Sequence, residues 1–340
     1  MQGYSHLCDV LKEREIDVAH IDQSLTYREN CQLLKSQFGV VPRKVDYRLK
    51  YREAEGALQG ALSREGMLAK ANIPAKAEKP ARAAKERPAE PQRPGLPGPN
   101  LPFDPIERGK ASEEIVMRGN TRLFYRFRNT DFYGGIITCD AMGCNLLCAH
   151  CWNYGRNENP IGKTFLSPEQ AAKKIVDMCA KEDQWYCRMS GCEPILGEQS
   201  ARYFKALMDA CDDYAIEKYE ECPNWILETN GIVLGYTPQL LEVLTGNYMT
   251  IRISFKGHNE EVFQAVTGAK GEYWKCPIEA FKKCQEIGIQ VIPACMPAFS
   301  DKTKLEELIG EPITDIERLR AYSKGTPERM RERGLEKYRR

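Results

Sequence analysis

Beyond residue 130 the sequence alternates between short β-rich runs and helical runs, and this alternation constrains the fold more than any other feature. The β-rich runs cover Gly134–Thr138, Trp185–Met189, Trp225–Glu228, Met249–Phe255, Ile289–Ala294 and a sixth within Ile313–Tyr322. The helical runs cover Ser167–Lys181, Ala201–Ala215, Pro238–Leu244, Ile278–Ile287 and Lys302–Leu308, with Ser167 placed as an N-cap. Repeats of this kind form a parallel sheet with helices outside. The sequence therefore predicts an α/β fold whose ligands gather at the carboxyl ends of the strands.

Residues 71–100 differ in composition from the rest of the chain. They hold seven prolines, seven alanines, nine charged residues and no aromatic residue. Such a segment cannot bury enough apolar surface to offset the entropy of ordering it, which is typical of a flexible linker. We place the linker at residues 67–110, between an N-terminal module of residues 1–66 and a larger domain of residues 111–340.

The module of residues 1–66 is predicted to be helical. Two helical runs, Arg28–Phe38 and Pro42–Ala54, meet at Gly39, and the second carries basic residues such as Arg43 and Arg48. The pair resembles a helix-turn-helix. A solvated helical hairpin that docks on the main domain or on a partner explains the same pattern, and we favour it, because basic residues usually form a wet helix face. Nucleic acid is therefore not an expected partner.

Charge and hydropathy give no sign of a membrane or of an exported protein. The net charge is only +1, so no field over the whole chain favours nucleic acid or acidic lipid. The apolar runs are shorter than the roughly 20 residues that a membrane span needs. The first residues lack the layout of a signal peptide, so we expect a cytoplasmic location. In that reducing compartment, clustered cysteines among the 14 in the chain indicate metal ligands or redox chemistry.

Three cysteines stand close together on a predicted loop after a strand, in the segment Cys144–Trp152, which reads CNLLCAHCW. Cys144, Cys148 and Cys151 offer soft thiolates, the ligands that iron–sulfur clusters prefer. A cubane cluster held by three cysteines keeps one iron open for an external ligand. Zinc sites favour two CxxC pairs or added histidines, so zinc is disfavoured here. His150 is expected to face solvent or to support the ligands, and Cys139 to lie inside the barrel or near the substrate.

The spacing CxxxCxxC followed by an aromatic residue resembles the signature of the radical S-adenosylmethionine (SAM) superfamily, and the segment is similar to the branch of pyruvate formate-lyase activating enzymes. The resemblance covers about residues 132–340. It implies a partial (β/α)6 parallel barrel, a [4Fe–4S] cluster on the three thiolates, and SAM bound at the open iron. Reductive cleavage of SAM then yields a 5′-deoxyadenosyl radical for hydrogen abstraction. A flavodoxin- or ferredoxin-like protein would supply the electron.

The same resemblance implies a set of SAM contacts at successive strand ends. The segment Ser190–Pro194 is similar to the family's Gly-Gly-Glu-Pro element, with Cys192 in place of the second glycine. Cys192 is either a tolerated small residue or a hydrogen-atom donor to the substrate radical. The residues that the resemblance assigns to SAM are Trp152, Gly191, Glu193, Pro194, Thr229, Asn230, Ser254, Lys256 and Ile292, the last as part of the adenine wall.

The substrate is left open by the sequence. An activase acting on a glycyl partner, a methylating or maturing enzyme acting on another protein or peptide, and an enzyme of a small molecule all fit. A tethered N-terminal module suits recruitment of a large substrate. From a different class, a DNA-binding regulator could use the cluster as a redox sensor, although a sensor would have no need of a SAM pocket.

Overall fold

A computed structural model describes residues 100–219, 221–247, 249–319 and 325–338. The predicted N-terminal module and almost all of the predicted linker lie outside the described residues. Residues 105–110, which we assigned to the linker, are instead the first half of helix α4 (Pro105–Val116). Asp104 caps this helix by accepting a hydrogen bond from the backbone N–H of Ile106 at 2.9 Å. Helical structure is thus present before residue 111, where the composition placed the start of the larger domain.

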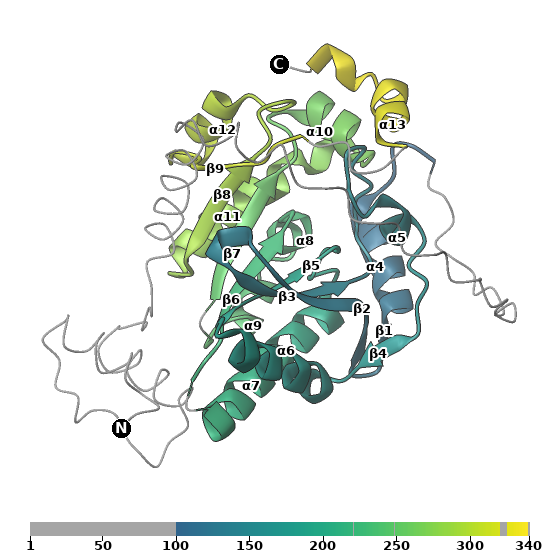
Figure 1. The fold of residues 1–340 in the computed structure, drawn as a ribbon. Helices are drawn as coiled ribbons and strands as arrows, with labels where there is room; N and C mark the ends of the chain where they lie inside the picture. Colours follow the sequence, from purple (N-terminus) through teal and green to yellow (C-terminus); the bar gives the residue numbers. More distant parts are fainter. Residues whose placement is uncertain (1–99, 220, 248, 320–324, 339–340) are drawn as a thin grey trace, which may run out of the picture.

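A nine-stranded sheet forms the centre of the described structure, in the order β1-β2-β3-β5-β6-β7-β8-β9, with β4 paired to β2 (Figure 1). The strands are β1 (Met117–Arg118), β2 (Thr121–Thr130), β3 (Ile136–Ala141), β4 (Thr164–Leu166), β5 (Tyr186–Ser190), β6 (Asn224–Thr229), β7 (Met249–Phe255), β8 (Val291–Cys295) and β9 (Asp315–Ile316). The six strands from β3 through β9 along this path are parallel. The predicted α/β fold with a (β/α)6-type parallel barrel is confirmed.

Helices follow most of the parallel strands. Besides α4 they are α5 (Tyr154–Glu158), α6 (Pro168–Glu182), α7 (Glu198–Tyr219), α8 (Ile232–Tyr236), α9 (Leu240–Val243), α10 (Glu260–Thr267), α11 (Cys276–Glu286), α12 (Lys302–Ile309) and α13 (Thr326–Glu332), with short 3₁₀ turns η4 (Phe132–Gly134), η5 (Gly271–Lys275) and η6 (Leu335–Tyr338). The predicted N-cap of α6 is confirmed, since Ser167 and Gln170 form a capping box. Within the described ranges, no helix is both long and apolar enough to span a membrane.

The two faces of the curved sheet carry different side chains, because successive strand residues point to opposite sides. The convex face packs against the helices in a large apolar core, where Ile137, Met189 and Ile253 meet residues such as Phe204 and Phe281. Lone cysteines such as Cys179 and Cys211 are fully buried in this core.

The concave face changes from apolar to polar along the strands. Near the amino ends, Ile136, Ile226 and Ile292 form a small buried cluster with Tyr133 and Tyr186 packed against it. The next side chains toward the carboxyl ends are polar or charged. The inner lining of the barrel is therefore apolar near the amino ends of the strands and polar toward their carboxyl ends.

The antiparallel strands β1, β2 and β4 were not predicted. Strand β2 pairs with β3 and so extends the parallel barrel at its first edge. In its sequence, TRLFYRFRNT, apolar and polar residues do not alternate regularly, because it carries three arginines that the fold places in specific contacts. Arg122 is fully buried, whereas Arg126 and Arg128 both pair with Asp140 on β3.

Candidate active site

A cavity of about 290 Å³ opens at the carboxyl ends of the parallel strands. The three thiols of the cysteine motif line it, and so do residues that follow β5, β6 and β7. Of the residues that the family resemblance assigned to SAM, the cavity wall includes Trp152, Gly191, Glu193, Thr229, Asn230, Ser254 and Lys256. The structure thus brings together side chains that are more than 100 positions apart in the sequence.

The loop that carries the cysteines is fixed through its backbone. The N–H groups of Leu147 and Ala149 donate to the carbonyl oxygens of Thr267 and Val266, at 3.1 and 2.9 Å, where α10 ends. The hydroxyl of Ser112 on α4 donates to the carbonyl oxygen of Cys144 at 3.2 Å. The loop conformation is therefore set by protein contacts on two sides.

Two arginines of the C-terminal segment complete this support. Arg329 on α13 donates from Nε to the carbonyl oxygen of Ala149 at 3.1 Å, and its guanidinium lies 4.0 Å from the ring centre of Tyr154. Arg333 donates to the carbonyl oxygen of Leu147 at 2.7 Å. We call Arg329 and Arg333 the arginine clamp. The sequence showed only a basic tail here, because the contact joins residues about 180 positions apart.

The thiols of Cys144, Cys148 and Cys151 are half-buried and free of disulfides. Two of the sulfur atoms accept weak hydrogen bonds, Cys144 Sγ from the backbone N–H of Leu146 at 3.4 Å and Cys151 Sγ from the Asn157 amide at 3.8 Å. N–H groups directed at sulfur are a usual feature of iron–sulfur sites, where they tune the cluster. The donor set therefore fits a cluster with thiolate ligands.

No group of three His, Cys, Asp or Glu side chains in the described ranges is arranged to hold a single metal ion. Burial raises the pKa of Cys148 to about 12 and also raises the pKa values of Cys144 and Cys151.

Glu193 connects the loops after β5 and β6. Its buried carboxylate accepts from the Thr229 hydroxyl at 2.7 Å and from the backbone N–H of Asn230 at 2.8 Å. Burial raises its pKa to about 7, against the lowering effect of these hydrogen bonds. Gly191, two residues before it, has φ +79°, and a Cβ there would lie 2.7 Å from the Tyr125 hydroxyl. The first glycine of the element is thus required by the backbone, whereas position 192 accepts a side chain.

Cys192 lines the cavity, and its surroundings include a residue that sequence reasoning missed. Arg122 on β2 donates to the carbonyl oxygens of Pro194 and Glu193, at 2.9 and 3.0 Å, and lies 3.8 Å from Cys192 Sγ. The arginine therefore holds the whole turn. Burial raises the pKa of Cys192 to about 12, although Arg122 lowers it, so the group is a neutral thiol.

Ser254 and Lys256 reach the cavity from the end of β7, as predicted, but they are bound to a third residue. Glu317, just after β9, accepts from Lys256 Nζ at 3.1 Å and from the Ser254 hydroxyl. The charges of Lys256 and Arg252, with these hydrogen bonds, outweigh burial and lower the pKa of Glu317 far below its usual range. No pattern in the sequence marks Glu317, because β9 is only two residues long.

Several positions differ from the sequence-based expectation. Ile292 lies in the apolar cluster near the amino ends of the strands, and Pro194 contributes a carbonyl group to Arg122; neither lines the cavity. Cys139 points to the convex core and not into the barrel, so that expectation was wrong. His150 lines the cavity with its Nδ1 atom buried, so it does not face bulk solvent.

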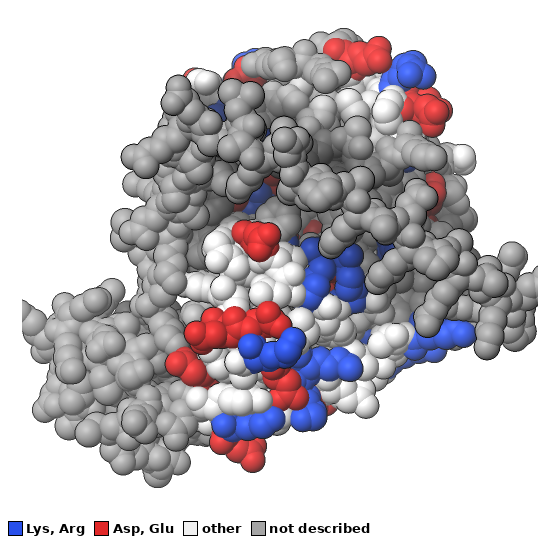
Figure 2. Space-filling model, in the orientation of Figure 1, with Lys and Arg blue, Asp and Glu red and all other residues white. Residues whose placement is uncertain are grey.

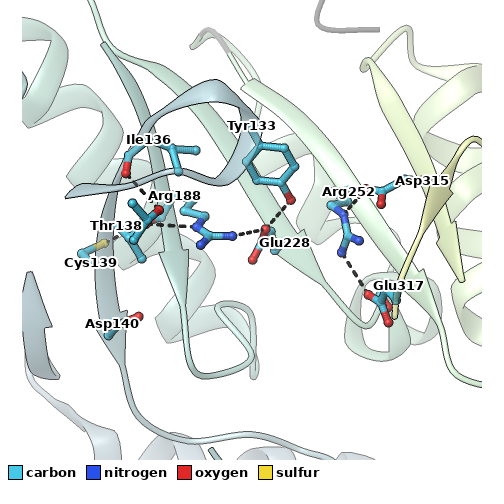
Figure 3. A network of polar contacts seen from close by, with 12 residues as sticks. Tyr133, Ile136, Thr138, Cys139, Asp140, Arg188, Glu228, Arg252, Asp315 and Glu317 are labelled. Atoms are coloured by element: carbon cyan, nitrogen blue, oxygen red, sulfur yellow. Dashed lines mark hydrogen bonds and ion pairs between the residues drawn. The ribbon is translucent and has the colours of Figure 1, made fainter. Parts of the chain in front are cut away.

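A polar network crosses the concave face, and the sequence analysis did not identify it (Figure 3). Arg188 on β5 donates to the Thr138 hydroxyl at 3.0 Å and to Glu228 on β6 at 2.7 Å. Arg252 on β7 donates to Asp315 at 2.5 Å and to Glu317 at 3.1 Å. The charged residues inside the strands could have indicated this network, since such residues are seldom buried unless they are paired.

Residues 141–308 match the model described as the radical SAM superfamily. The match includes the three thiols and every strand from β5 to β8. No curated protein matches the chain.

Solved structures with a similar arrangement include native anSMEcpe with bound AdoMet, at 18% identity and TM-score 0.36, over 46% of this chain and 42% of that one. They also include SuiB of Streptococcus suis bound to S-adenosylmethionine, at 17% identity and TM-score 0.36, over 50% of this chain and 35% of that one. The chain therefore corresponds to less than half the length of either protein.

Proposed function

The chain is an iron–sulfur enzyme by virtue of the radical SAM domain in residues 141–308, with a [4Fe–4S] cluster and SAM as cofactors, and from this premise we propose that it abstracts hydrogen from a protein or peptide substrate. The observation that carries the proposal is the single cavity that the three thiols share with seven of the residues assigned to SAM. A redox sensor would have no use for the residues assigned to SAM.

We assign the cluster to Cys144, Cys148 and Cys151. Bound cluster and SAM together supply a 5′-deoxyadenosyl radical. The protein's own groups orient SAM: Glu193, Thr229 and Asn230 after β5 and β6, and Ser254 and Lys256 after β7. Trp152, which is 39% exposed, covers the rim of the cavity. Near the amino ends of the strands, the apolar cluster of Ile136, Ile226 and Ile292 limits the access of water.

Cys192 is our candidate for the hydrogen-atom donor. Only a neutral thiol has an S–H hydrogen to give, and burial keeps this one protonated. Its hydrogen would pass to a substrate carbon radical, leaving a thiyl radical that needs one electron and one proton for the next turnover. A Cys192→Ser variant should still cleave SAM and abstract hydrogen, but it should fail to return hydrogen to the substrate.

The finer assignment to the branch of pyruvate formate-lyase activating enzymes is part of the proposal, and it rests on the CNLLCAHCW segment. The proposal also includes a flavodoxin- or ferredoxin-like reductant, a cytoplasmic location, and recruitment of a large substrate by residues 1–66. A nucleic-acid partner is not proposed. On the face in Figure 2, the described surface over α6 and α7 carries acidic and basic side chains interspersed, with ion pairs such as Lys173–Asp177 and Arg202–Glu198.

The decisive experiment is anaerobic reconstitution of the full chain with iron and sulfide, followed by reduction and addition of SAM. We expect 5′-deoxyadenosine and methionine to form in equal amounts. A Cys148→Ala protein prepared in the same way is the matched control and should form neither. An intact [4Fe–4S] spectrum without any cleavage of SAM would instead favour a sensor.

A further inference from the structure

Glu228 and Arg252 stand side by side on the concave face, on the neighbouring strands β6 and β7. Their Cα atoms are register partners in the parallel ladder. Both residues line the cavity that holds the three thiols. No ion pair or hydrogen bond joins the two side chains directly within the described structure. The pair thus presents an acceptor and a donor next to each other.

Each of the two side chains already makes hydrogen bonds to neighbouring protein groups through some of its polar atoms. Glu228 accepts through Oε1 from Arg188 at 2.7 Å and from the Tyr133 hydroxyl (Figure 3). Its Oε2 atom makes no hydrogen bond with any described residue, and it is not among the fully buried polar atoms that lack a partner. Glu228 Oε2 is therefore accessible from the cavity.

Arg252 follows the same pattern. Its Nε atom donates to Asp315 and its Nη1 atom to Glu317, whereas Nη2 makes no hydrogen bond with any described residue. Nη2 is likewise absent from the fully buried polar atoms without a partner. These hydrogen bonds fix both side chains, so Glu228 Oε2 and Arg252 Nη2 are held in place.

The charges of Glu228, Arg252 and their ion-pair partners are balanced. Arg188 offsets the charge of Glu228, and Lys256 with Arg252 offsets Asp315 and Glu317. Burial raises the pKa of Glu228, but the charges of Arg188 and Arg252 and the bond from Tyr133 bring it below its ordinary value. Because each charge is already compensated, the site does not require an ion; a neutral group with one donor and one acceptor satisfies both free atoms.

We propose that Glu228 and Arg252 form a recognition site for an amide group of the substrate, with Glu228 Oε2 accepting its N–H and Arg252 Nη2 donating to its C=O. In an extended peptide the N–H and C=O of one residue point to the same side, and they exchange paired hydrogen bonds in this way across antiparallel strands. A primary carboxamide, as in Asn or Gln, offers the same two groups. This inference rests on the proposed function and specifies the substrate chemistry of that site.

The test measures binding alone, on the full-length reconstituted protein without SAM, so that it is independent of whether SAM is cleaved. The probe is N-acetylglycine N-methylamide, titrated by ligand-observed NMR. Its comparison is 2-acetoxy-N-methylacetamide, in which an ester oxygen replaces the glycine N–H. We expect the ester to bind about 5-fold or more weakly, since the charge-assisted bond to Glu228 is lost. Equal affinities in the wild-type protein would overturn the proposal without any variant being made.

Two variants locate the effect. Glu228→Gln should weaken binding of the diamide and leave the ester unchanged, whereas Arg318→Gln, which removes an exposed charge at the same cavity, should change neither. A loss for both probes in Glu228→Gln would contradict a specific amide contact. Propionamide and free glycine complete the series. If propionamide binds as tightly as the diamide, the recognised amide is a primary carboxamide. If propionamide binds more weakly, the recognised amide belongs to a peptide backbone. Tighter binding of glycine would overturn the proposal in favour of a zwitterion site.

Discussion

Arg333 donates a 2.7 Å hydrogen bond to the carbonyl oxygen of Leu147, which lies between two of the proposed cluster ligands and 186 positions earlier in the chain. The arginine is half-buried and close enough to Cys148 to lower the pKa of that thiol. A positive charge and a backbone contact therefore act on the cluster loop from the same side chain.

The arginine clamp should control how firmly the cluster is held and how easily it is reduced. Arg333→Met should increase the rate at which a chelator removes iron, because the loop loses one of its supports. It should also shift the reduction potential of the cluster to more negative values, since a nearby cation stabilises the reduced, more anionic form. Chelation kinetics and a potentiometric titration followed by electron paramagnetic resonance measure the two effects.

Arg331→Met is the matched control, because Arg331 is exposed on α13, two positions before Arg333. It should leave both quantities unchanged. Equal shifts in the two variants would mean that the general charge of α13 acts, and not the clamp.

Cluster ligation is expected to depend on each of the three thiols. Alanine at Cys144, Cys148 or Cys151 should abolish the [4Fe–4S] absorbance and the cleavage of SAM together, because two protein ligands hold a cubane poorly. Cys139→Ala should preserve both, since Cys139 lies in the convex core. Iron analysis and visible spectra are sufficient. A cluster retained in Cys148→Ala and lost in Cys139→Ala would refute the assignment.

Lys256 and Glu317 should have opposite effects on SAM affinity. Lys256→Ala should weaken binding by about 1–3 kcal/mol if the ammonium contacts the carboxylate of SAM. Glu317→Gln should strengthen binding, because it removes the anion that now pairs with Lys256 at 3.1 Å and would repel that carboxylate. Equilibrium titration with SAM measures both. Weaker binding in both variants would show that Glu317 itself contacts SAM.

Asp212 makes stability depend on pH. It is buried on α7, and burial raises its pKa to about 7, against a hydrogen bond from Asn247. The folded state therefore holds this proton more tightly than the unfolded chain. The resulting stability is present at low pH and is lost as pH rises through about 7. At about 1.4 kcal/mol per pH unit, the loss amounts to a few kcal/mol.

Asp212→Asn should remove this loss, because an amide resembles the neutral acid. Chemical denaturation at pH 5 and pH 8 should show a smaller difference for this variant than for the wild type. Glu217→Gln, at an exposed position on the same helix, should retain the wild-type difference. An unchanged difference in Asp212→Asn would show that other groups carry the pH dependence.

Two truncations test where the domain begins. Deletion of residues 1–99 should leave a folded protein that assembles its cluster. Deletion of residues 1–110 should not, because it removes the Asp104 cap and Arg108, whose buried guanidinium donates to the carbonyl oxygen of Asn157 at 2.8 Å. Thermal unfolding and iron content distinguish the two. Failure of the shorter deletion would place residues 1–99 within the folded core.

The sequence predicted the features that depend on local patterns. The helix start at Ser167, the extent of β7 and the spacing of the three thiols are all encoded within a few residues. The register of a side chain is harder to predict, because a shift of one residue moves it to the opposite face of the sheet. Cys139 was misplaced for this reason, whereas Ile292 lies on the concave face but near the amino end of β8.

The residues that the sequence analysis missed act through tertiary contacts. Arg122 reaches the turn at Pro194 across 72 positions, and Glu317 reaches Lys256 across 61. No local pattern marks either residue, since an arginine or a glutamate is usually exposed. Only the pairing of β2 with β3, and of β8 with β9, brings them to the cavity.

The position of the arginine clamp also has a consequence for the order of events during synthesis. The contact between Ala149 and Arg329 spans 180 positions. A ribosome adds about 5–20 residues per second, so roughly 10–40 s separate the appearance of the cysteine loop from that of its last support. During that interval every thiol ligand has already been made, yet the loop lacks both arginines. Stable insertion of the cluster is therefore expected to follow completion of the chain.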